Sequence, residues 1–294
     1  MTKKNPVIAV TGSSGAGTTT VKVAMQHIYR RNGYKAVVVE GDSFHKYERK
    51  EMKEALDRAT EEGWNLSHFG PEGNEFGMLA DLFKKYRETG TGTIRKYLHN
   101  EEEAAPYNQQ PGTFSPWEAI EEDSDLMFYE GLHGGASDGK VDISKYVDLL
   151  IGVTPIVNLE WIQKIHRDTS ERGYSSEAVT DTILRRMYDY VHYMTPQYSK
   201  THINFQRVPT VDTSNPFIAR DIPTPDESFV VIRFGTALWR QIDYNYLLNM
   251  LQGSFMSRKN SIVVPGGKMG FALEIIVEPL ITNLITKGKL EWSL

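Results

Sequence analysis

The sequence predicts an α/β fold built on a doubly wound, mostly parallel β-sheet. Three observations carry this prediction. Short apolar runs rich in β-branched residues recur along the 294-residue chain without clear alternation, as in strands that are buried on both faces. Helical patterns separate these runs, so strands and helices alternate. A glycine-rich loop joins the first run to the first helix.

Six apolar runs are expected to form the sheet, and helical patterns lie between them. The expected strands cover residues 7–10, 36–39, 126–129, 147–153, 204–208 and 230–234. The expected helices cover residues 18–31, 157–171, 176–194, 236–251 and 270–285. Pro196 follows the third of these helices, where a proline is expected because it cannot continue a helix.

Residues 61–117 interrupt the alternation of strands and helices. They are dense in glycine and proline, in segments such as "HFGPEGNEFGML" and "PYNQQPGTFSPW". Because such segments mark loops, we expect a long insertion that carries substrate or oligomer contacts, within a single domain over residues 1–294. The acidic tract 99–106 is expected to be a solvated surface.

The composition excludes several classes of function. The formal net charge is −5, whereas nucleic-acid-binding proteins usually show a basic excess, so no nucleic-acid partner is expected. No apolar run approaches the roughly 18 residues of a membrane span, and the run at 7–10 is too short for a signal peptide. The chain has no cysteine, which excludes disulfides, thiol catalysis and zinc–thiolate sites. A cytoplasmic protein without membrane contact is expected.

The loop after the first strand has the frame of a phosphate-binding loop. Its glycines allow backbone N–H groups to wrap around phosphate oxygens, and the helix that follows directs its N-terminus at the anion. The alternative is a glycine turn that holds no ligand. The residues expected to bind nucleotide are Gly12, Ser13, Ser14, Gly15, Ala16, Gly17, Thr18 and Thr19.

This loop departs from its usual form at position 18, where threonine replaces lysine. The change removes one positive charge from near the transferred phosphate. Phosphoryl transfer depends on positioning and on charge neutralisation, so a cation must come from elsewhere. The loop alone therefore predicts nucleotide binding better than it predicts catalysis.

Two acids follow expected strands. Glu130 ends the run 126–129, and a strand-end acid near a phosphate loop holds Mg²⁺; with the Thr19 hydroxyl it is the predicted metal site for Mg²⁺ bound with ATP. The alternative for Glu130 is a structural role.

Asp42 follows the run 36–39, at the edge where open α/β sheets bind ligands. We expect Asp42 to orient an attacking hydroxyl and accept its proton, and its alternative role is a helix N-cap.

His45 and Arg49 are four residues apart, so they share one face if a helix follows Asp42. Arginine binds phosphate through two parallel hydrogen bonds. The pair is therefore a candidate contact for a phosphate on the acceptor substrate.

Other segments are specific enough to indicate a family. "KIHRDTSERGYSSEAV" (164–179) resembles the diagnostic segment of phosphoribulokinases. The lysine-free loop "GSSGAGT", the segments "DSFH" and "EGLH", and the strand "VVIRFG" (230–235) also resemble that family. The resemblance covers nearly the whole chain and implies a P-loop nucleoside-triphosphate-hydrolase-like kinase fold. The short, cysteine-free form resembles the bacterial, oligomeric branch.

The resemblance implies ATP-dependent phosphorylation of D-ribulose 5-phosphate at its 1-hydroxyl, giving ribulose 1,5-bisphosphate and ADP. It suggests Asp42 as the catalytic base, Glu130 as the metal carboxylate and Asp168 as a second essential acid. It also suggests that Arg172 joins His45 and Arg49 in contacting the sugar phosphate.

The bacterial branch implies regulation and assembly as well. Its members are typically activated by NADH and inhibited by AMP, and Arg233 matches an arginine tied to that regulation. A homo-oligomer, by resemblance an octamer, is expected.

Lys164 is the candidate for the missing positive charge. It lies four residues before Asp168, so both share one helical face. If a mobile segment here closes over ATP, Lys164 reaches the phosphates, as closing segments do in other kinases. The alternative is a surface salt bridge worth about 0.3–0.5 kcal/mol with no catalytic role.

Two other functions stay open at this level. One is a small-metabolite or nucleoside kinase of the uridine kinase type, whose acceptor lacks a phosphate. The other is a nucleotide sensor that lost its loop lysine and no longer catalyses. The basic cluster at 45, 49 and 172 favours an anionic acceptor. The three acids at 42, 130 and 168 argue against a sensor.

Overall fold

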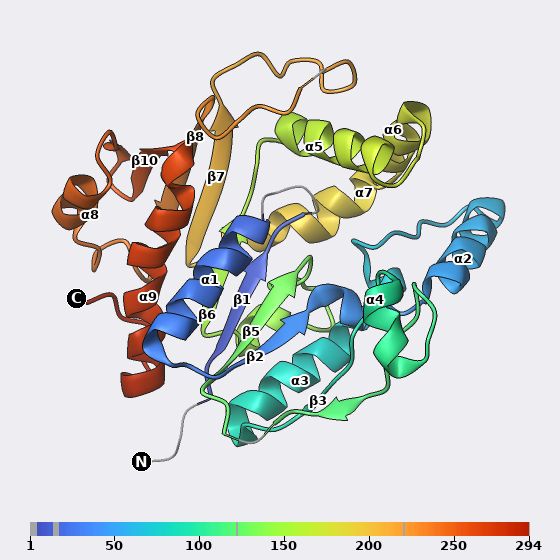
Figure 1. Ribbon diagram of the computed structural model, residues 1–294, viewed down its shortest axis with the longest axis horizontal. Helices are drawn as coiled ribbons and strands as arrows, with labels where there is room; N and C mark the ends of the chain where they lie inside the picture. Colours follow the sequence, from blue (N-terminus) through green and yellow to red (C-terminus); the bar gives the residue numbers. More distant parts are fainter. Residues whose placement is uncertain (1–4, 14–17, 122, 220, 294) are drawn as a thin grey trace.

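The computed structural model describes residues 5–13, 18–121, 123–219 and 221–293. Its main sheet has eight strands in the order β2-β5-β1-β6-β7-β8-β10-β9, with helices on both faces (Figure 1). The strands are β1 (Val7–Thr11), β2 (Ala36–Glu40), β5 (Leu126–Gly131), β6 (Leu149–Val153), β7 (Ile203–Pro209), β8 (Ser228–Phe234), β9 (Phe255–Arg258) and β10 (Ser261–Pro265). A separate pair joins β3 (Thr93–Ile94) to β4 (Glu118–Ala119).

The sheet has a parallel half and an antiparallel half. Strands β2, β5, β1, β6 and β7 pair in parallel. Strands β8, β10 and β9 continue the sheet in antiparallel pairs. The predicted mostly parallel, doubly wound sheet is therefore confirmed. The sequence analysis missed its late strands β9 and β10, and it missed the separate pair β3 and β4.

Each face of the sheet has its own core. On one face, α1 (Thr18–Asn32) and α9 (Met269–Lys287) lie side by side, with α8 (Tyr244–Met250) beyond them (Figure 1). On the other face, α3 (Phe76–Thr89) packs against the parallel strands through Leu79, Phe83 and Tyr86. Strands β1 and β6 are buried along their whole length, which explains their continuous apolar sequence.

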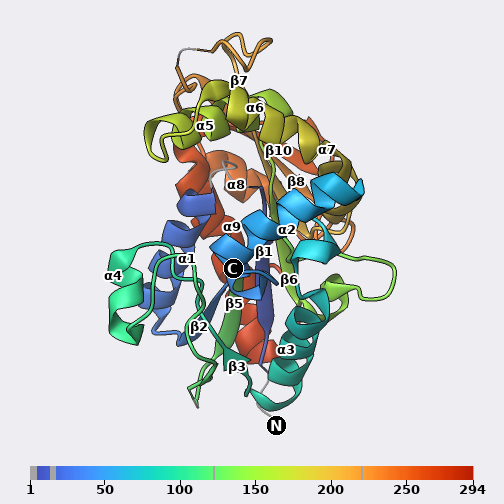
Figure 2. The same cartoon turned by 90° about the vertical axis from the view of Figure 1, so that its right-hand side faces the viewer.

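The remaining helices gather near the carboxyl ends of the parallel strands. Helices α5 (Val157–Ser170), α6 (Ser176–Arg185) and α7 (Met187–Asp189) cross above these strand ends in both views (Figures 1 and 2). Helix α7 continues into a π-helical turn, Tyr190–Met194, and a 3₁₀ turn, Thr195–Ser199. Helices α2 (Arg49–Glu62) and α4 (Glu101–Ala104) complete this end.

Two expected helices differ from the structure. The helix expected at 236–251 is only α8, because residues 236–241 form turns and the helix begins after Asp243, whose side chain caps it by accepting from the N–H of Tyr246. The helix expected at 176–194 is divided into α6, α7 and the π-helical turn. Within 61–117, α3 and α4 were missed entirely. Helix α2, which begins at Arg49, was also missed.

The antiparallel half is covered on one face only. Along β8, buried and more exposed residues alternate: Val230, Ile232 and Phe234 face the α9 side, whereas Phe229 and Arg233 are exposed. The expected two-sided burial is wrong for this strand, because Phe229 and Arg233 on its second face are exposed.

The sequence analysis expected no apolar run that approaches the length of a membrane span, but the segment around helix α9 is such a run. Gly266–Lys287 is long and apolar enough to cross a membrane by length and composition, with a mean hydropathy of 1.5. Half of that apolar window is buried inside the protein, where Ile276, Val277 and Leu280 belong to the main core. A core helix passes the same test, so α9 is best described as part of the core.

Candidate active site

A contact between two glycines brings Asp42 and Glu130 to one edge of the sheet. Gly41 follows β2 and Gly131 ends β5, and their backbones touch. A Cβ atom added at Gly131 would lie 2.7 Å from the Cα of Gly41, and one added at Gly41 would lie 2.6 Å from the Tyr129 hydroxyl. Only glycine fits at both positions, so the two acids beside them are held at neighbouring strand ends.

The phosphate loop begins beside this edge. The N–H of Gly12 donates to the carbonyl of Gly131 at 3.2 Å, and Ser13 is buried. The predicted residues Ser14, Gly15, Ala16 and Gly17 lie outside the described residues. Thr18 and Thr19 are the first residues of α1, which is the strand–loop–helix context that a phosphate loop requires.

Glu130 lies at the loop's side of the sheet with two groups that the sequence analysis did not single out. Glu130 pairs in register with Glu40 of β2, so both carboxylates emerge at the same strand ends. Lys22 of α1 donates to Glu40 at 2.8 Å. This hydrogen bond, with a further contribution from the charge of Glu130, raises the pKa of Lys22 although burial opposes the rise.

Asp42 lies among histidines. Its Oδ1 is 3.2 Å from Nε2 of His45, and its Oδ2 is 3.7 Å from Nε2 of His99. Burial opposes ionisation, but the hydrogen bond with His45 and the charges of His45 and His99 hold the pKa of Asp42 well below its usual range. The side chain is 41% exposed, so its carboxylate is both ionised and accessible to a substrate.

The helix on which His45 and Arg49 were expected to share a face does not exist. Gly41–Phe44 form a short 3₁₀ turn, and α2 begins only at Arg49. Helix α2 is capped by Glu48, so Asp42 is not its N-cap. Arg49 nevertheless stays close to the site, because its Nη2 donates to the carbonyl of His99 at 3.0 Å.

Asp168 of α5 is surrounded by cations. Lys164 donates to Oδ2, Arg167 Nη2 lies 3.0 Å from Oδ1, and Arg172 Nη1 lies 3.2 Å from the same oxygen. Burial opposes ionisation, but Lys164 and Arg167 lower the pKa of Asp168. The side chains of Lys164 and Asp168 are only 15% and 6% exposed. The pair is therefore not the surface salt bridge of the alternative reading.

Helix α5 carries Lys164 and Glu160, which line one small pocket with Tyr190. Glu160, one turn earlier on the same face, accepts from the Tyr190 hydroxyl at 2.9 Å. Burial raises the pKa of Glu160, although the hydroxyls of Ser13 and Tyr190 beside it oppose the rise. Burial likewise lowers the pKa of Lys164, although Asp168 opposes that change. Because Ser13 belongs to the predicted phosphate loop, Glu160 of α5 lies beside the start of that loop.

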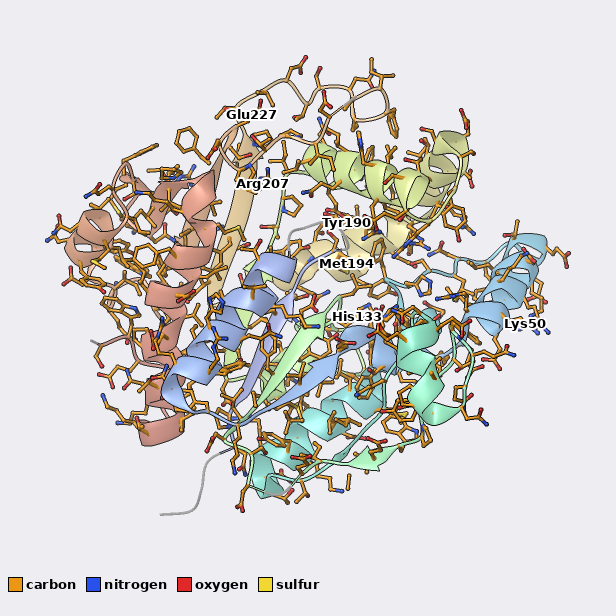
Figure 3. All side chains as sticks on the ribbon, viewed as in Figure 1. Lys50, His133, Tyr190, Met194, Arg207 and Glu227 are labelled. Atoms are coloured by element: carbon orange, nitrogen blue, oxygen red, sulfur yellow. The ribbon has the colours of Figure 1, made fainter. Side chains whose placement is uncertain are left out.

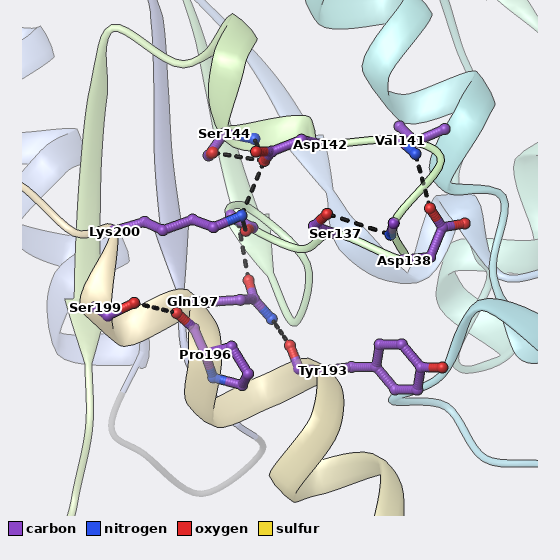
Figure 4. Close-up of polar contacts among 12 residues, drawn as sticks. Ser137, Asp138, Val141, Asp142, Ser144, Tyr193, Pro196, Gln197, Ser199 and Lys200 are labelled. Atoms are coloured by element: carbon purple, nitrogen blue, oxygen red, sulfur yellow. Dashed lines mark hydrogen bonds and ion pairs between the residues drawn. The ribbon is translucent and has the colours of Figure 1, made fainter.

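The segment after α7, which includes Tyr190 and Met194, lies below α5 in Figure 3. Its residue Gln197 connects this segment to the end of β1 and to the turn after β5. Gln197 is buried, and both its amide oxygen and its amide nitrogen form hydrogen bonds. Oε1 accepts from Thr11 Oγ1 at 2.8 Å and from the N–H of Gly135 at 2.9 Å. Its Nε2 donates to the carbonyls of Leu132 and Tyr193 (Figure 4). One side chain thus joins the end of β1, the turn after Glu130 and the helical segment.

Arg233 lies elsewhere, on the uncovered face of the antiparallel strands. It lines a groove of about 710 Å³ between that face and the helical segment after α7. Arg258, Asn204 and Gln206 line the same groove, and Tyr190 and Tyr198 form its opposite wall. Tyr190 also lines the small pocket that contains Lys164 and Glu160, so one side chain borders both sites.

Comparison with known proteins agrees with this geometry. The model of the phosphoribulokinase / uridine kinase family matches residues 7–214. The chain belongs to the phosphoribulokinase family. It is 59% identical to the chromosomal phosphoribulokinase of Cupriavidus necator over 290 residues, covering 98% of this chain and 99% of that one. It is 57% identical to a probable phosphoribulokinase of Escherichia coli, covering 99% of this chain and all of that one.

A solved structure extends the likeness to three dimensions. The phosphoribulokinase from Rhodobacter spheroides superposes with a TM-score of 0.88 at 53% identity, covering 97% of this chain and 98% of that one. As a member of the phosphoribulokinase family, the chain is a kinase, a phosphotransferase with the P-loop kinase fold.

Several residues of this phosphoribulokinase-family site were missed by the sequence analysis. His99 lies beside Asp42, although its tract at 99–106 was expected to be a solvated surface. The hydrogen bond between Glu160 and Tyr190 joins α5 to the π-helical turn after α7. No local pattern marks these residues, because their partners are more than 25 residues away along the chain. Conversely, among the described contacts Arg172 meets Asp168 and not His45.

Proposed function

We propose that the chain transfers the γ-phosphate of ATP to the 1-hydroxyl of D-ribulose 5-phosphate, giving ribulose 1,5-bisphosphate and ADP. Full-length identity of 53–59% to phosphoribulokinases supports this substrate. The observation that carries the mechanism is Asp42, an ionised, accessible carboxylate next to His45 at the strand end that adjoins the phosphate loop.

In this proposal Asp42 orients the acceptor hydroxyl and accepts its proton as the phosphoryl group is transferred. A group with a low pKa serves here, because phosphoryl transfer has a loose transition state in which little proton transfer is needed early. His45, Arg49 and Arg172 hold the phosphate of the acceptor. His45 lies against Asp42, and Arg49 is held at the same site through His99.

Residues 12–19 hold the phosphates of ATP. The residues present fit Mg²⁺, because the Glu130 carboxylate lies at the loop's strand edge and oxygen ligands suit this ion. Glu130 and Thr19 are the proposed ligands, and the ion would neutralise charge on the β- and γ-phosphates. Lys164 supplies the positive charge that the loop lacks, and Asp168 holds the Lys164 ammonium in place.

The groove around Arg233 is the proposed effector site. Two arginines, Arg233 and Arg258, lie there among polar strand residues, and such a surface suits an anionic nucleotide. NADH as activator and AMP as inhibitor are the proposed ligands.

The protein is proposed to be cytoplasmic and a homo-oligomer, by resemblance an octamer. The side chains of Leu184 in α6, Tyr188 in α7 and Val191 in the π-helical turn are exposed, and association would cover them.

The substrate proposal is tested by ADP release with Mg-ATP and either ribulose 5-phosphate, uridine or no acceptor. We expect rapid release with ribulose 5-phosphate alone. Release with uridine would indicate the uridine kinase type. ATP binding without release for any acceptor would indicate a nucleotide sensor.

The effector proposal is tested by Arg233→Ala. Activation by NADH is expected to be lost, while activity without effector stays within about twofold, because Arg233 lies on the antiparallel strands and not among the strand ends that carry the acids. Arg240→Ala is the matched control, since Arg240 lies over the Trp239 ring and does not line the groove. An NADH response that persists in Arg233→Ala would place the effector elsewhere.

A further inference from the structure

Arg95 holds the main chain of the turn that carries Asp42. Its Nε donates to the carbonyl of Ser43 at 2.9 Å, and its Nη2 donates to the carbonyl of His45 at 3.0 Å. Ser43 and His45 are buried, and a buried carbonyl that loses its partner destabilises the folded chain. One side chain therefore satisfies two carbonyls, one on each side of Phe44.

The guanidinium of Arg95 packs against two aromatic rings. Its Cζ lies 3.5 Å from the centre of the Phe114 ring and 4.8 Å from that of the Trp117 ring. The Trp117 ring also meets the Phe44 ring edge-on, with 6.1 Å between the ring centres. Because a guanidinium is planar and stacks on aromatic rings, its two donors point in fixed directions here.

The segment that begins at Arg95 contacts this turn at every second residue. Arg95 follows strand β3 directly and binds the main chain of the turn. Two residues further on, the Tyr97 ring lies 6.1 Å from the ring of His45. Two residues beyond that, His99 Nε2 lies 3.7 Å from Asp42. Arg95 therefore joins the insertion to the strand end where the proposed base lies.

We propose that Arg95 is a positioning residue for phosphoryl transfer, which places the Asp42 carboxylate by holding the main chain of its turn. The proposal rests on the function proposed above, in which Asp42 accepts the proton of the acceptor hydroxyl. The contact between Gly41 and Gly131 fixes the start of the turn, and Arg95 fixes its end. A displacement of about 1 Å in a reacting group costs roughly 10²-fold in rate, so this hold is expected to matter for turnover.

The hydrogen bonds of Arg95 separate this role from that of an ordinary ion pair. In the described part of the chain, its side chain donates to carbonyls of the main chain and not to a carboxylate. Lysine would carry the same charge, but its ammonium lacks the planar fork that gives two parallel donors. We therefore expect Arg95→Lys to fold and still to lose activity.

The first test is a double-mutant cycle in the full chain, read as kcat with Mg-ATP and ribulose 5-phosphate. Arg95→Lys is expected to lower kcat about tenfold and Arg95→Met about 10²-fold, with KM for ATP unchanged. In the Asp42→Asn background, Arg95→Met should lower kcat by less than about threefold, because the carboxylate that Arg95 places is already lost. A purely structural role predicts the same loss in both backgrounds, and that result would overturn the inference.

The second test needs no substrate. Hydrogen–deuterium exchange of the full chain, read by mass spectrometry, should be faster in peptides that cover 41–48 of Arg95→Met than in the same peptides of the wild type. Peptides of α9 should exchange as before. Unchanged exchange at 41–48 would contradict the inference. Faster exchange there, with no turnover of ribulose 5-phosphate by the wild type, would instead overturn the proposed function and support the hold of Arg95 on the turn.

Arg207→Met is the matched control for Arg95→Met. Arg207 of β7 is also half-buried and also donates to a carbonyl of the main chain, that of Pro223, and its Nε donates to Ser228 Oγ at 3.1 Å. Its loss should lower the midpoint of thermal unfolding without changing kcat or the exchange at 41–48. An equal loss of kcat in both variants would show that the effect is not specific to the Asp42 turn, and the inference would fail.

Discussion

Asp42→Asn is expected to lower kcat roughly 10²–10⁴-fold, the range for loss of a general base. Asparagine keeps the size of the side chain but cannot accept the proton of the acceptor hydroxyl. The 3₁₀ turn that carries Asp42 is fixed by the contact between Gly41 and Gly131, which the substitution leaves intact. Steady-state ADP release checks the loss, and direct titration should show unchanged affinity for Mg-ATP.

The control for this variant is Asp57→Asn, which removes an exposed carboxylate from α2 and should leave kcat unchanged. If Asp42→Asn keeps kcat within about tenfold of the wild type, the proton acceptor lies elsewhere. His99 would then be the first residue to test, because it is the nearest other titratable group with an exposed side chain beside Asp42.

Lys164→Met is expected to lower kcat about 10²–10³-fold, the range for loss of one group that stabilises charge in a transition state. The loop has threonine where its usual lysine stands, so no residue of the loop compensates. Asp168 retains Arg167 and Arg172 as partners, so its carboxylate is not left unpaired. The measurement is kcat in parallel with the midpoint of thermal unfolding.

Lys200→Met is the matched control for Lys164→Met. Lys200 is also half-buried and also pairs with an aspartate, since its Nζ lies 2.9 Å from Asp142 (Figure 4). Its loss should lower the unfolding temperature with little change in kcat. If Lys164→Met behaves like Lys200→Met, the Lys164 pair is structural and the missing charge comes from another residue.

The sequence was sufficient to predict that Asp42 and Glu130 lie at one edge of the sheet, because parallel strands end at the same edge. Glu130 and Asp42 each follow an apolar run, and β2 and β5 pair in the structure with Glu40 and Glu130 in register. The predicted strand–loop–helix order likewise placed residues 12–19 at that edge. These inferences use chain order and strand direction, which local sequence determines well.

The missed elements depend on contacts between distant segments. Helix α3 lies among glycines and prolines, and Gly90 ends it in the left-handed conformation, so composition alone indicated a loop there. His99 and Asn74 reach Asp42 and His45 only after the segments at 65–74 and 95–114 fold over the strand end. The residue pattern within one segment carries no information about contacts with distant segments.

The packing of α9 on α1 has a consequence for synthesis. Helix α1 begins at the phosphate loop, near the start of the chain, whereas α9 is the last helix in the described residues. Met25 and Ile28 of α1 share a core with Ile276 and Leu280 of α9. A ribosome makes the chain from its N-terminus, so these α1 side chains remain without their final partner until α9 emerges. Incomplete chains that lack α9 therefore expose the apolar face of α1, the kind of surface that favours aggregation during synthesis.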